Sequence, residues 1–293
     1  MGAALLSALL AACGGGGGGA AGLASTQAAM ISGYAIDGPV SGGTVAAYAV
    51  SGGARGAMLA SATTDATGHF SLSVGSYAGG VMLQLSGGSY VDDATGSMTT
   101  MAAGTAMTAV VASIGAGAAL DGIQITPVTS MAQAYARGMS GGMTDANIAA
   151  ANAALGNYFG ISGASDILHT MPIDPRVGGS GSGASQASIN YGMALAAMSQ
   201  YAHAQGLTNP STMITAYMND AGDGVMNGIA SGSPVMMGGM GMGGGSAMSA
   251  AAASAGLASA MSSFVSSAQN QSGVTAPQMQ GLMSSLAASN GVL

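Results

Sequence analysis

Charged side chains are almost absent from this sequence. Of 293 residues only 3 are Lys or Arg and 10 are Asp or Glu, so charged residues make up 4%, where a soluble domain usually carries about 25%. Lys and Glu do not occur, and the three bases are Arg55, Arg137 and Arg176. Three scattered Arg cannot neutralise the phosphates that a nucleic acid presents, so we expect no nucleic-acid partner. Chemistry that needs a catalytic Lys or Glu is excluded as well.

Large aromatic side chains and cysteine are also scarce. Trp is absent and aromatic residues make up 4% of the chain, whereas Met occurs 24 times. A core must therefore be built from small aliphatic side chains and Met, which packs adaptably. The single cysteine, Cys13, excludes a disulfide within one chain.

The start of the chain has the pattern of a lipoprotein signal. An apolar segment over 1–12 is too short to span a bilayer and leads directly into Cys13. The sequence LAAC at 10–13 resembles a bacterial lipobox, which implies lipid attachment at Cys13. A signal segment usually begins with Lys or Arg, but here Gly2 and Ala3 follow Met1 directly. We therefore expect a truncated signal segment whose true start lies upstream. The glycine run after Cys13 predicts a flexible tether over 13–29, an interpretation we favour over a buried free thiol.

Short alternating apolar runs separated by turns dominate the region 30–118. They predict β-strands over 31–36, 44–50, 58–63, 69–74, 81–85 and 107–111. Several short strands at a spacing of about 8 to 12 residues are typical of an all-β sandwich.

Two motifs in this region point to a family. They are GYAIDGPVSGGTV at 33–45 and TDATGHFSL at 64–72. They resemble the carboxypeptidase regulatory-like (transthyretin-like) β-sandwich family, in which G-x-V-x-D-x-x-x-x-P-x-x-G-A-x-V precedes T-D-x-x-G-x-F. The resemblance implies an antiparallel transthyretin/Ig-like sandwich that serves as a stalk, spacer or binding module. Residues 90–96 are similar to a turn found in envelope lipoproteins of this type.

The region 119–293 changes to a helical period. Thr126 before Pro127, Thr144 before Asp145 and Asn209 before Pro210 have the pattern of helix caps. Further helices are predicted over 185–205, around 257–265 and around 279–286, with a Gly/Met-rich loop at about 232–246. Segments at 125–129, 146–153 and 191–200 resemble the helical region of uncharacterised envelope lipoproteins. No charged residue follows Asp223, but Ser, Asn and Gln interrupt every apolar run, which argues against a transmembrane helix.

Motifs of catalysis occur without their structural context. GMSGG at 138–142 fits the G-x-S-x-G pattern around Ser140, but a helix rather than a strand is expected before it. The G-x-G-x-x-G pattern at 239–244 lacks a surrounding βαβ unit. The histidines His69, His169 and His203 share no metal-ligand spacing, so we interpret them as solvated polar residues.

Two groups of residues have the chemistry of metal ligands. Asp37, Asp65, Asp92 and Asp93 together offer oxygens of the kind that Ca²⁺ binds, but turn capping explains them better, and the turn at 219–224 lacks the terminal carboxylate of a calcium loop. The cluster MMGGMGM at 236–242 offers soft thioethers suited to Cu(I) or Ag(I). A flexible Gly/Met-rich loop is the favoured interpretation of that cluster.

These patterns together predict an α+β multidomain protein, with a β-sandwich over 30–118 and a mainly helical domain over 119–293. We expect a non-enzymatic binding or structural module, attached to the outer membrane of a cell envelope through a lipid on Cys13. We expect no metal and no cofactor, while a protein or glycan ligand stays unidentified. The alternative is a periplasmic Met-rich protein that binds Cu(I) or Ag(I).

Overall fold

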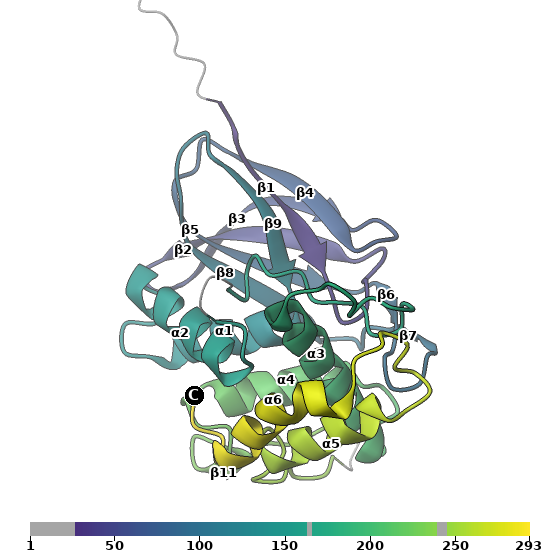
Figure 1. The fold of residues 1–293 in the computed structure, drawn as a ribbon. Coiled ribbons are helices and arrows are strands. Elements are labelled where there is room, and N and C mark those ends of the chain that lie inside the picture. The colour runs from purple at the N-terminus through teal and green to yellow at the C-terminus, as the bar shows by residue number, and fades with distance from the viewer. Residues whose placement is uncertain (1–26, 163–165, 239–244) are drawn as a thin grey trace, which may run out of the picture.

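The strands precede the helices along the chain (Figure 1). A computed structural model describes residues 27–162, 166–238 and 245–293. The strands are β1 Ala29–Ala35, β2 Thr44–Ser51, β3 Ala54–Thr63, β4 His69–Gly75, β5 Gly79–Ser86, β6 Ser89–Val91, β7 Met98–Thr100, β8 Ala106–Ile114, β9 Ala119–Ile125, β10 Ile229–Ala230 and β11 Ser233–Pro234. The helices are α1 Pro127–Gly138, α2 Asp145–Tyr158, α3 Gln186–Ala204, α4 Thr212–Ala221, α5 Ala255–Val265 and α6 Ala276–Ala288.

Two sheets enclose the first core. One has the strand order β4-β1-β9, and the other has the order β3-β2-β5-β8. Most neighbouring strands are antiparallel, but β1 and β9 are parallel. Alternate residues of both sheets point into one shared core, which includes Ile31, Phe70, Leu83, Met107 and Ile123. This alternation is the period-two pattern that predicted the strands.

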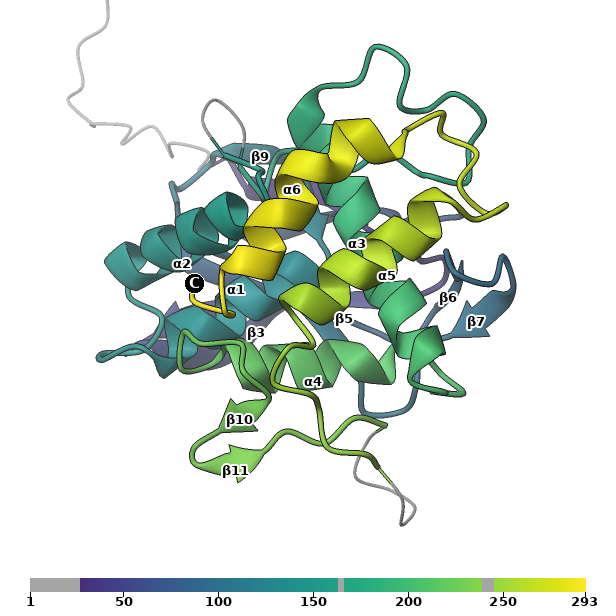
Figure 2. The same cartoon turned by 60° about the horizontal axis from the view of Figure 1, so that its bottom comes forward.

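The four-stranded sheet is covered on its other face by helices. Met82 of β5 and Val110 of β8 pack against Ala136 of α1 and against Ile148 and Ala151 of α2. Figure 2 shows the remaining helices gathered beyond α1, and α5 packs against both α3 and α6. Their core is built mainly from Ala, Met and Leu, with buried rings from Phe159, Tyr191, Tyr217 and Phe264. The helical region therefore lies directly against the strands as a further layer.

A hydrogen-bonded cluster of uncharged side chains joins β8 to the helices. This hydroxyl network consists of Thr108, Thr126, Thr129, Ser130 and Tyr191, all buried. Ser130 Oγ accepts a hydrogen bond from the Thr108 backbone N–H at 2.7 Å, and Thr129 Oγ1 donates to the Thr108 carbonyl at 2.8 Å. The oxygens of Thr126 and Tyr191 lie 2.7 Å apart. Because each hydroxyl has a partner, the network joins the layers without burying an unsatisfied polar group.

The α+β class predicted from sequence is confirmed, as are the six predicted strands, which correspond to β1–β5 and β8, and the helices at 127 and 145. Thr126 and Thr144 cap α1 and α2 as predicted. The cap predicted at Asn209 is wrong. Helix α4 begins at Thr212, and Asn209 Oδ1 instead accepts hydrogen bonds from the backbone N–H and hydroxyl of Ser211.

The strand region extends further than position 118. Strand β9 pairs with β1 and so adds 119–125 to the three-stranded sheet. At the other end, β1 begins at Ala29. Within the described residues, no helix combines the length and apolar character that crossing a bilayer requires.

Candidate functional site: an acidic cavity between strands and helices

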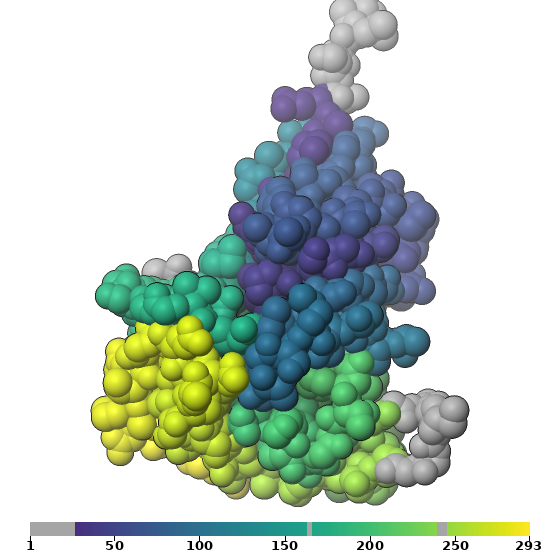
Figure 3. Space-filling model, turned by 90° about the vertical axis from the view of Figure 1, so that its right-hand side faces the viewer, coloured from purple at the N-terminus to yellow at the C-terminus, as the bar shows by residue number. Residues whose placement is uncertain are grey.

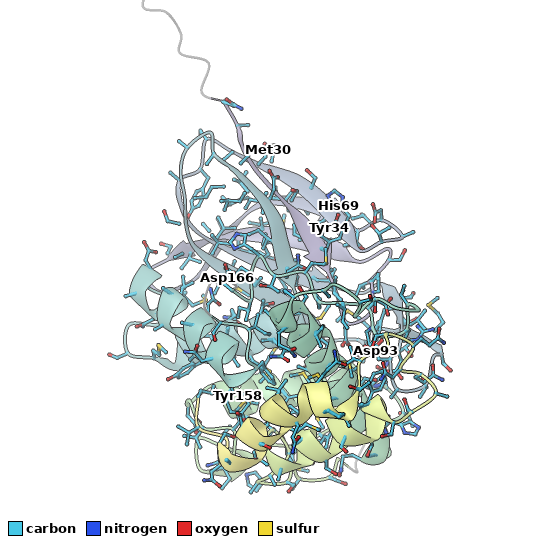
Figure 4. The ribbon with its side chains drawn as sticks, viewed as in Figure 1. Met30, Tyr34, His69, Asp93, Tyr158 and Asp166 are labelled. Atoms are coloured by element: carbon cyan, nitrogen blue, oxygen red, sulfur yellow. The ribbon has the colours of Figure 1, made fainter. Side chains whose placement is uncertain are left out.

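A cavity of about 490 Å³ lies where the turn after β1, the strand β6 and the loop before α3 meet. We call it the acidic cavity. Figure 4 labels Asp93, one of the cavity's lining residues, between the strands and the yellow helices. The lining residues are Gly38, Pro39, Ser41, Ala66, Ser89, Tyr90, Val91, Asp93, Met98, Asp174 and Arg176. Two carboxylates and one guanidinium therefore face a wall that is otherwise mostly apolar or hydroxylated.

The turn after β1 closes one side of the cavity. Gly38 has a φ of +73°, and a Cβ atom there would lie 2.5 Å from the Val91 carbonyl oxygen. Only glycine allows the turn to approach β6 this closely. The preceding residue, Asp37, is thereby held near Tyr90 and Asp92.

Asp92 is the structurally satisfied member of the acidic group. Its Oδ1 accepts hydrogen bonds from the Thr95 backbone N–H at 2.9 Å and from the Thr95 hydroxyl at 2.7 Å. Its Oδ2 accepts a hydrogen bond from Ser199 Oγ of α3 at 2.5 Å. Asp92 therefore joins the loop after β6 to the helical core, and Figure 3 shows the blue surface of this loop region against the green and yellow helices.

Asp93, by contrast, has no side-chain hydrogen bond within the described parts of the chain, although its residue is only 5% exposed. The Tyr90 hydroxyl and Nε of Arg176 are buried and have no partner among the described residues. Buried polar groups usually find a partner, so two such groups beside one cavity need an explanation. A bound ligand would supply these partners.

Burial and mutual repulsion change the acidity of the carboxyl groups. Desolvation, followed by the charge of Asp92, raises the pKa of Asp37 to about 7. The Tyr90 hydroxyl offsets part of this rise, although its geometry falls short of a full hydrogen bond. Desolvation and then Asp37, Asp174 and Asp92 raise the pKa of Asp93 well above its usual value, against a smaller opposing effect of Arg176. Beside the cavity, Asp37 thus takes up a proton near neutral pH, and the pKa of Asp93 in the lining is raised in the same direction.

The four aspartates weighed for Ca²⁺ do not come together. Asp37, Asp92 and Asp93 lie near one another, but Asp65 caps its own turn by accepting hydrogen bonds from Thr67 and His69. Across the described residues, no three His, Cys or carboxylate side chains converge as a metal ion requires. The turn at 219–224 completes the end of α4 and brings Asp220 Oδ1 to the Gly228 backbone N–H at 2.7 Å.

The other residues singled out from sequence lie apart from the acidic cavity. Ser140 is exposed in the turn after α1. His69 packs edge-on against Tyr34, His169 pairs with Asp166 at 3.0 Å, and His203 is exposed at the end of α3.

The methionine cluster is divided by the fold. Met236 is 52% exposed, whereas Met237 is buried in the helical core. Met240 and Met242, together with the G-x-G-x-x-G pattern at 239–244, lie outside the described residues, and so does Cys13. The Cu(I) or Ag(I) site therefore stays a prediction.

No protein-family model matches this chain, and a search of curated proteins finds no match. The sequence patterns point to Asp37, Asp92 and Asp93 but not to Tyr90, Asp174 and Arg176 as functional residues. The signal for the last two was present, since Asp174 and Arg176 are the charged residues of the Pro-rich segment before α3. Nothing in the sequence indicated that this segment lies against β6.

Proposed function

We propose that this protein is a non-enzymatic binding module of the cell envelope, which takes a small amine-bearing ligand in the acidic cavity. The single observation that carries the proposal is Asp93, a carboxyl-bearing residue only 5% exposed that lines the cavity beside the unpartnered Tyr90 hydroxyl and Arg176 Nε. A carboxylate so largely removed from water is costly, so it either holds a proton or pairs with a cation. An ammonium group supplies both the charge and the hydrogen-bond donors.

The rest of the lining supports a small organic amine as the ligand. Asp93 and Asp174 provide negative charge, while Pro39, Tyr90 and Met98 provide apolar contact for a short alkyl chain. Entry of an ammonium group would displace the proton from Asp93. The binding affinity is therefore expected to depend on pH.

The transthyretin-like sandwich stays part of the proposal. It is supported by the two turns of the sequence motifs, in which Gly38 permits the close approach to β6 and Asp65 accepts three hydrogen bonds. It is also supported by the single core that the two sheets share. Sheets of this kind commonly present binding surfaces at their ends, where the acidic cavity lies.

Attachment to the outer membrane through a lipid on Cys13 is the localisation we propose. The position of Met30 supports it, because Figure 4 shows this residue at the end of the strands opposite the helices. A chain anchored beyond that end would present the helical region and the acidic cavity away from the bilayer. Metabolic labelling with radioactive palmitate should mark the wild-type chain and not a Cys13→Ser variant. Equal labelling of both would refute the anchor.

The ligand proposal is tested by calorimetric titration of the full chain with putrescine at pH 8. We expect saturable binding that Asp93→Asn weakens about tenfold, in line with the loss of one charge-assisted contact. The matched control is Asp121→Asn, which changes the net charge of the protein by the same amount. Asp121 is exposed on β9, outside the cavity, and accepts a hydrogen bond from Ser32. Equal weakening by both variants, or binding of Ca²⁺ but not putrescine, would overturn the proposal.

A further inference from the structure

Two of the three arginines of the chain line a second cavity, of about 390 Å³. We call it the arginine cavity. Arg55 comes from the edge strand β3, and Arg137 comes from the last turn of α1. The other lining residues are uncharged: Ala54, Met82, Gln84, Ala106, Thr108, Gln133, Met143 and Met218. In a chain with ten aspartates and three arginines, this cavity has positive charge and no carboxylate in its lining.

Arg55 is held in place by two neighbours. Its Nη1 donates a hydrogen bond to Gln84 Oε1 at 3.0 Å, and its guanidinium carbon lies 4.8 Å from the ring centre of Tyr48. Both contacts restrict the side chain and leave further N–H groups of the guanidinium available. Arg137 makes no ion pair or side-chain hydrogen bond with any described residue.

The amides of the arginine cavity also present donors. Because Gln84 Oε1 accepts from Arg55, its amide nitrogen is left for another partner. Gln133 is only 2% exposed, and its Nε2 has a single partner, Met143 Sδ at 3.2 Å. A thioether is a weak acceptor, so this buried amide retains most of its capacity to donate. The groups with spare hydrogen-bonding capacity are therefore guanidinium and amide N–H donors.

A larger cavity lies on the other side of Arg137. It measures about 620 Å³ and shares Arg137 and Met218 with the arginine cavity. Hydroxyl-bearing residues are frequent in its lining: Thr212, Thr215, Ser231 and Ser233. Asp223 also contributes to this lining, so the larger cavity favours an uncharged, hydroxylated part of a ligand over a second anionic group.

We propose that the arginine cavity binds the oxyanion of a hydroxylated ligand, a sugar acid or a sugar phosphate. A carboxylate and a phosphate share the geometry that guanidinium groups recognise through paired N–H donors. The net charge of the chain is −7, so the long-range field opposes an anion and the affinity must come from these local donors. This site is separate from the acidic cavity and takes a ligand of the opposite charge.

The test is calorimetric titration of the full chain at low ionic strength with D-glucuronate, glucose 1-phosphate and glucose. We expect one or both anions to bind at least about tenfold more tightly than glucose, and the stronger one identifies the oxyanion. Arg55→Gln and Arg137→Gln should each weaken that binding about tenfold, the effect of losing one charge-assisted contact.

Arg176→Gln is the matched control, because it removes the same charge from the acidic cavity. It should leave the anion affinity within about twofold, and thermal unfolding should confirm that all three variants are folded. Equal weakening by all three variants would show general electrostatic attraction and overturn the proposal. Equal affinity for glucose and the anions, or no binding of either anion, would overturn it as well.

Discussion

The hydroxyl network and the acidic cavity both lie where strands meet helices, yet they differ in how their polar groups are satisfied. In the hydroxyl network each hydroxyl has a partner and none carries a charge. Around the acidic cavity the Tyr90 hydroxyl and Arg176 Nε have none among the described residues, and neighbouring carboxyl groups repel one another. Uncharged groups therefore suffice to join the layers. The carboxyl groups are destabilising unless a ligand pairs with them, which is the pattern of a functional site.

The largest effect is expected from breaking the satisfied network. Thr129→Val removes a fully buried hydroxyl that donates to the Thr108 carbonyl and accepts from the Thr126 N–H at 2.8 Å. We expect a loss of about 2 to 3 kcal/mol in the free energy of unfolding, because the buried partners are left unsatisfied. Urea denaturation measures it. The exposed strand residue Thr63 provides the control, and an equal loss in Thr63→Val would contradict the assignment.

Removal of the desolvated charge of Asp37, beside the acidic cavity, should have the opposite sign. The folded-state pKa of Asp37 is about 7, above its ordinary 3.8, so wild-type stability falls as pH rises from about 4 to about 7. Asp37→Asn abolishes this contribution. The variant should therefore gain about 1 to 2 kcal/mol relative to wild type between pH 5 and pH 8.

Asp65→Asn gives the contrasting control for Asp37→Asn. Hydrogen bonds from Thr67 lower the pKa of Asp65, so its contribution to stability is present above the unfolded pKa and is lost as pH falls. This variant should lose stability at pH 8. A pH-independent difference between Asp37→Asn and wild type in thermal melts would show that Asp37 does not titrate as inferred.

Ligand binding should separate the two cavities by pH. Putrescine stays protonated up to pH 8, whereas the pKa of Asp37 is about 7 and the pKa of Asp93 is raised well above its usual value by burial and then by Asp37, Asp174 and Asp92, against Arg176. Its affinity should rise by up to about tenfold per pH unit from pH 5.5 to pH 7.5, as linkage to one displaced proton requires. Binding of D-glucuronate in the arginine cavity should stay flat, because neither arginine nor the ligand carboxylate titrates in this range. Calorimetric titrations with each ligand at pH 5.5 and pH 7.5 measure the two affinities. A putrescine affinity that is equal at both pH values would contradict the prediction.

The smallest effect is expected from the residue that positions Arg55. Gln84→Leu removes its hydrogen bond to Nη1 but keeps the guanidinium charge. Anion affinity should fall about threefold, equivalent to roughly 0.7 kcal/mol of lost preorganisation. Gln269→Leu, near the loop at 95–96, should leave the affinity unchanged. If Gln84→Leu has no effect, Arg55 does not need this neighbour to bind the anion.

The elements that the sequence predicted are those with strong local signals. Alternation located strands such as β5, and the Thr-Pro pattern located the start of α1. The missed strands lack such signals. Strands β6 and β7 have three residues each, and Asp121 and Gly122 interrupt β9. Asn209 misled the cap prediction because its side chain closes the turn before α4 instead of capping the helix.

Local chemistry by itself determined the class of the fold, the order of its strands and helices and the exclusion of Lys and Glu chemistry. It also identified Asp37, Asp92 and Asp93 as residues of interest. The tertiary structure alone decided that β9 pairs in parallel with β1, that Asp174 and Arg176 join those aspartates, and that Arg55 and Arg137 share one cavity. The reason is physical: periodicity and caps act between residues a few positions apart. Cavities and shifted pKa values arise from burial among segments that are distant in the chain.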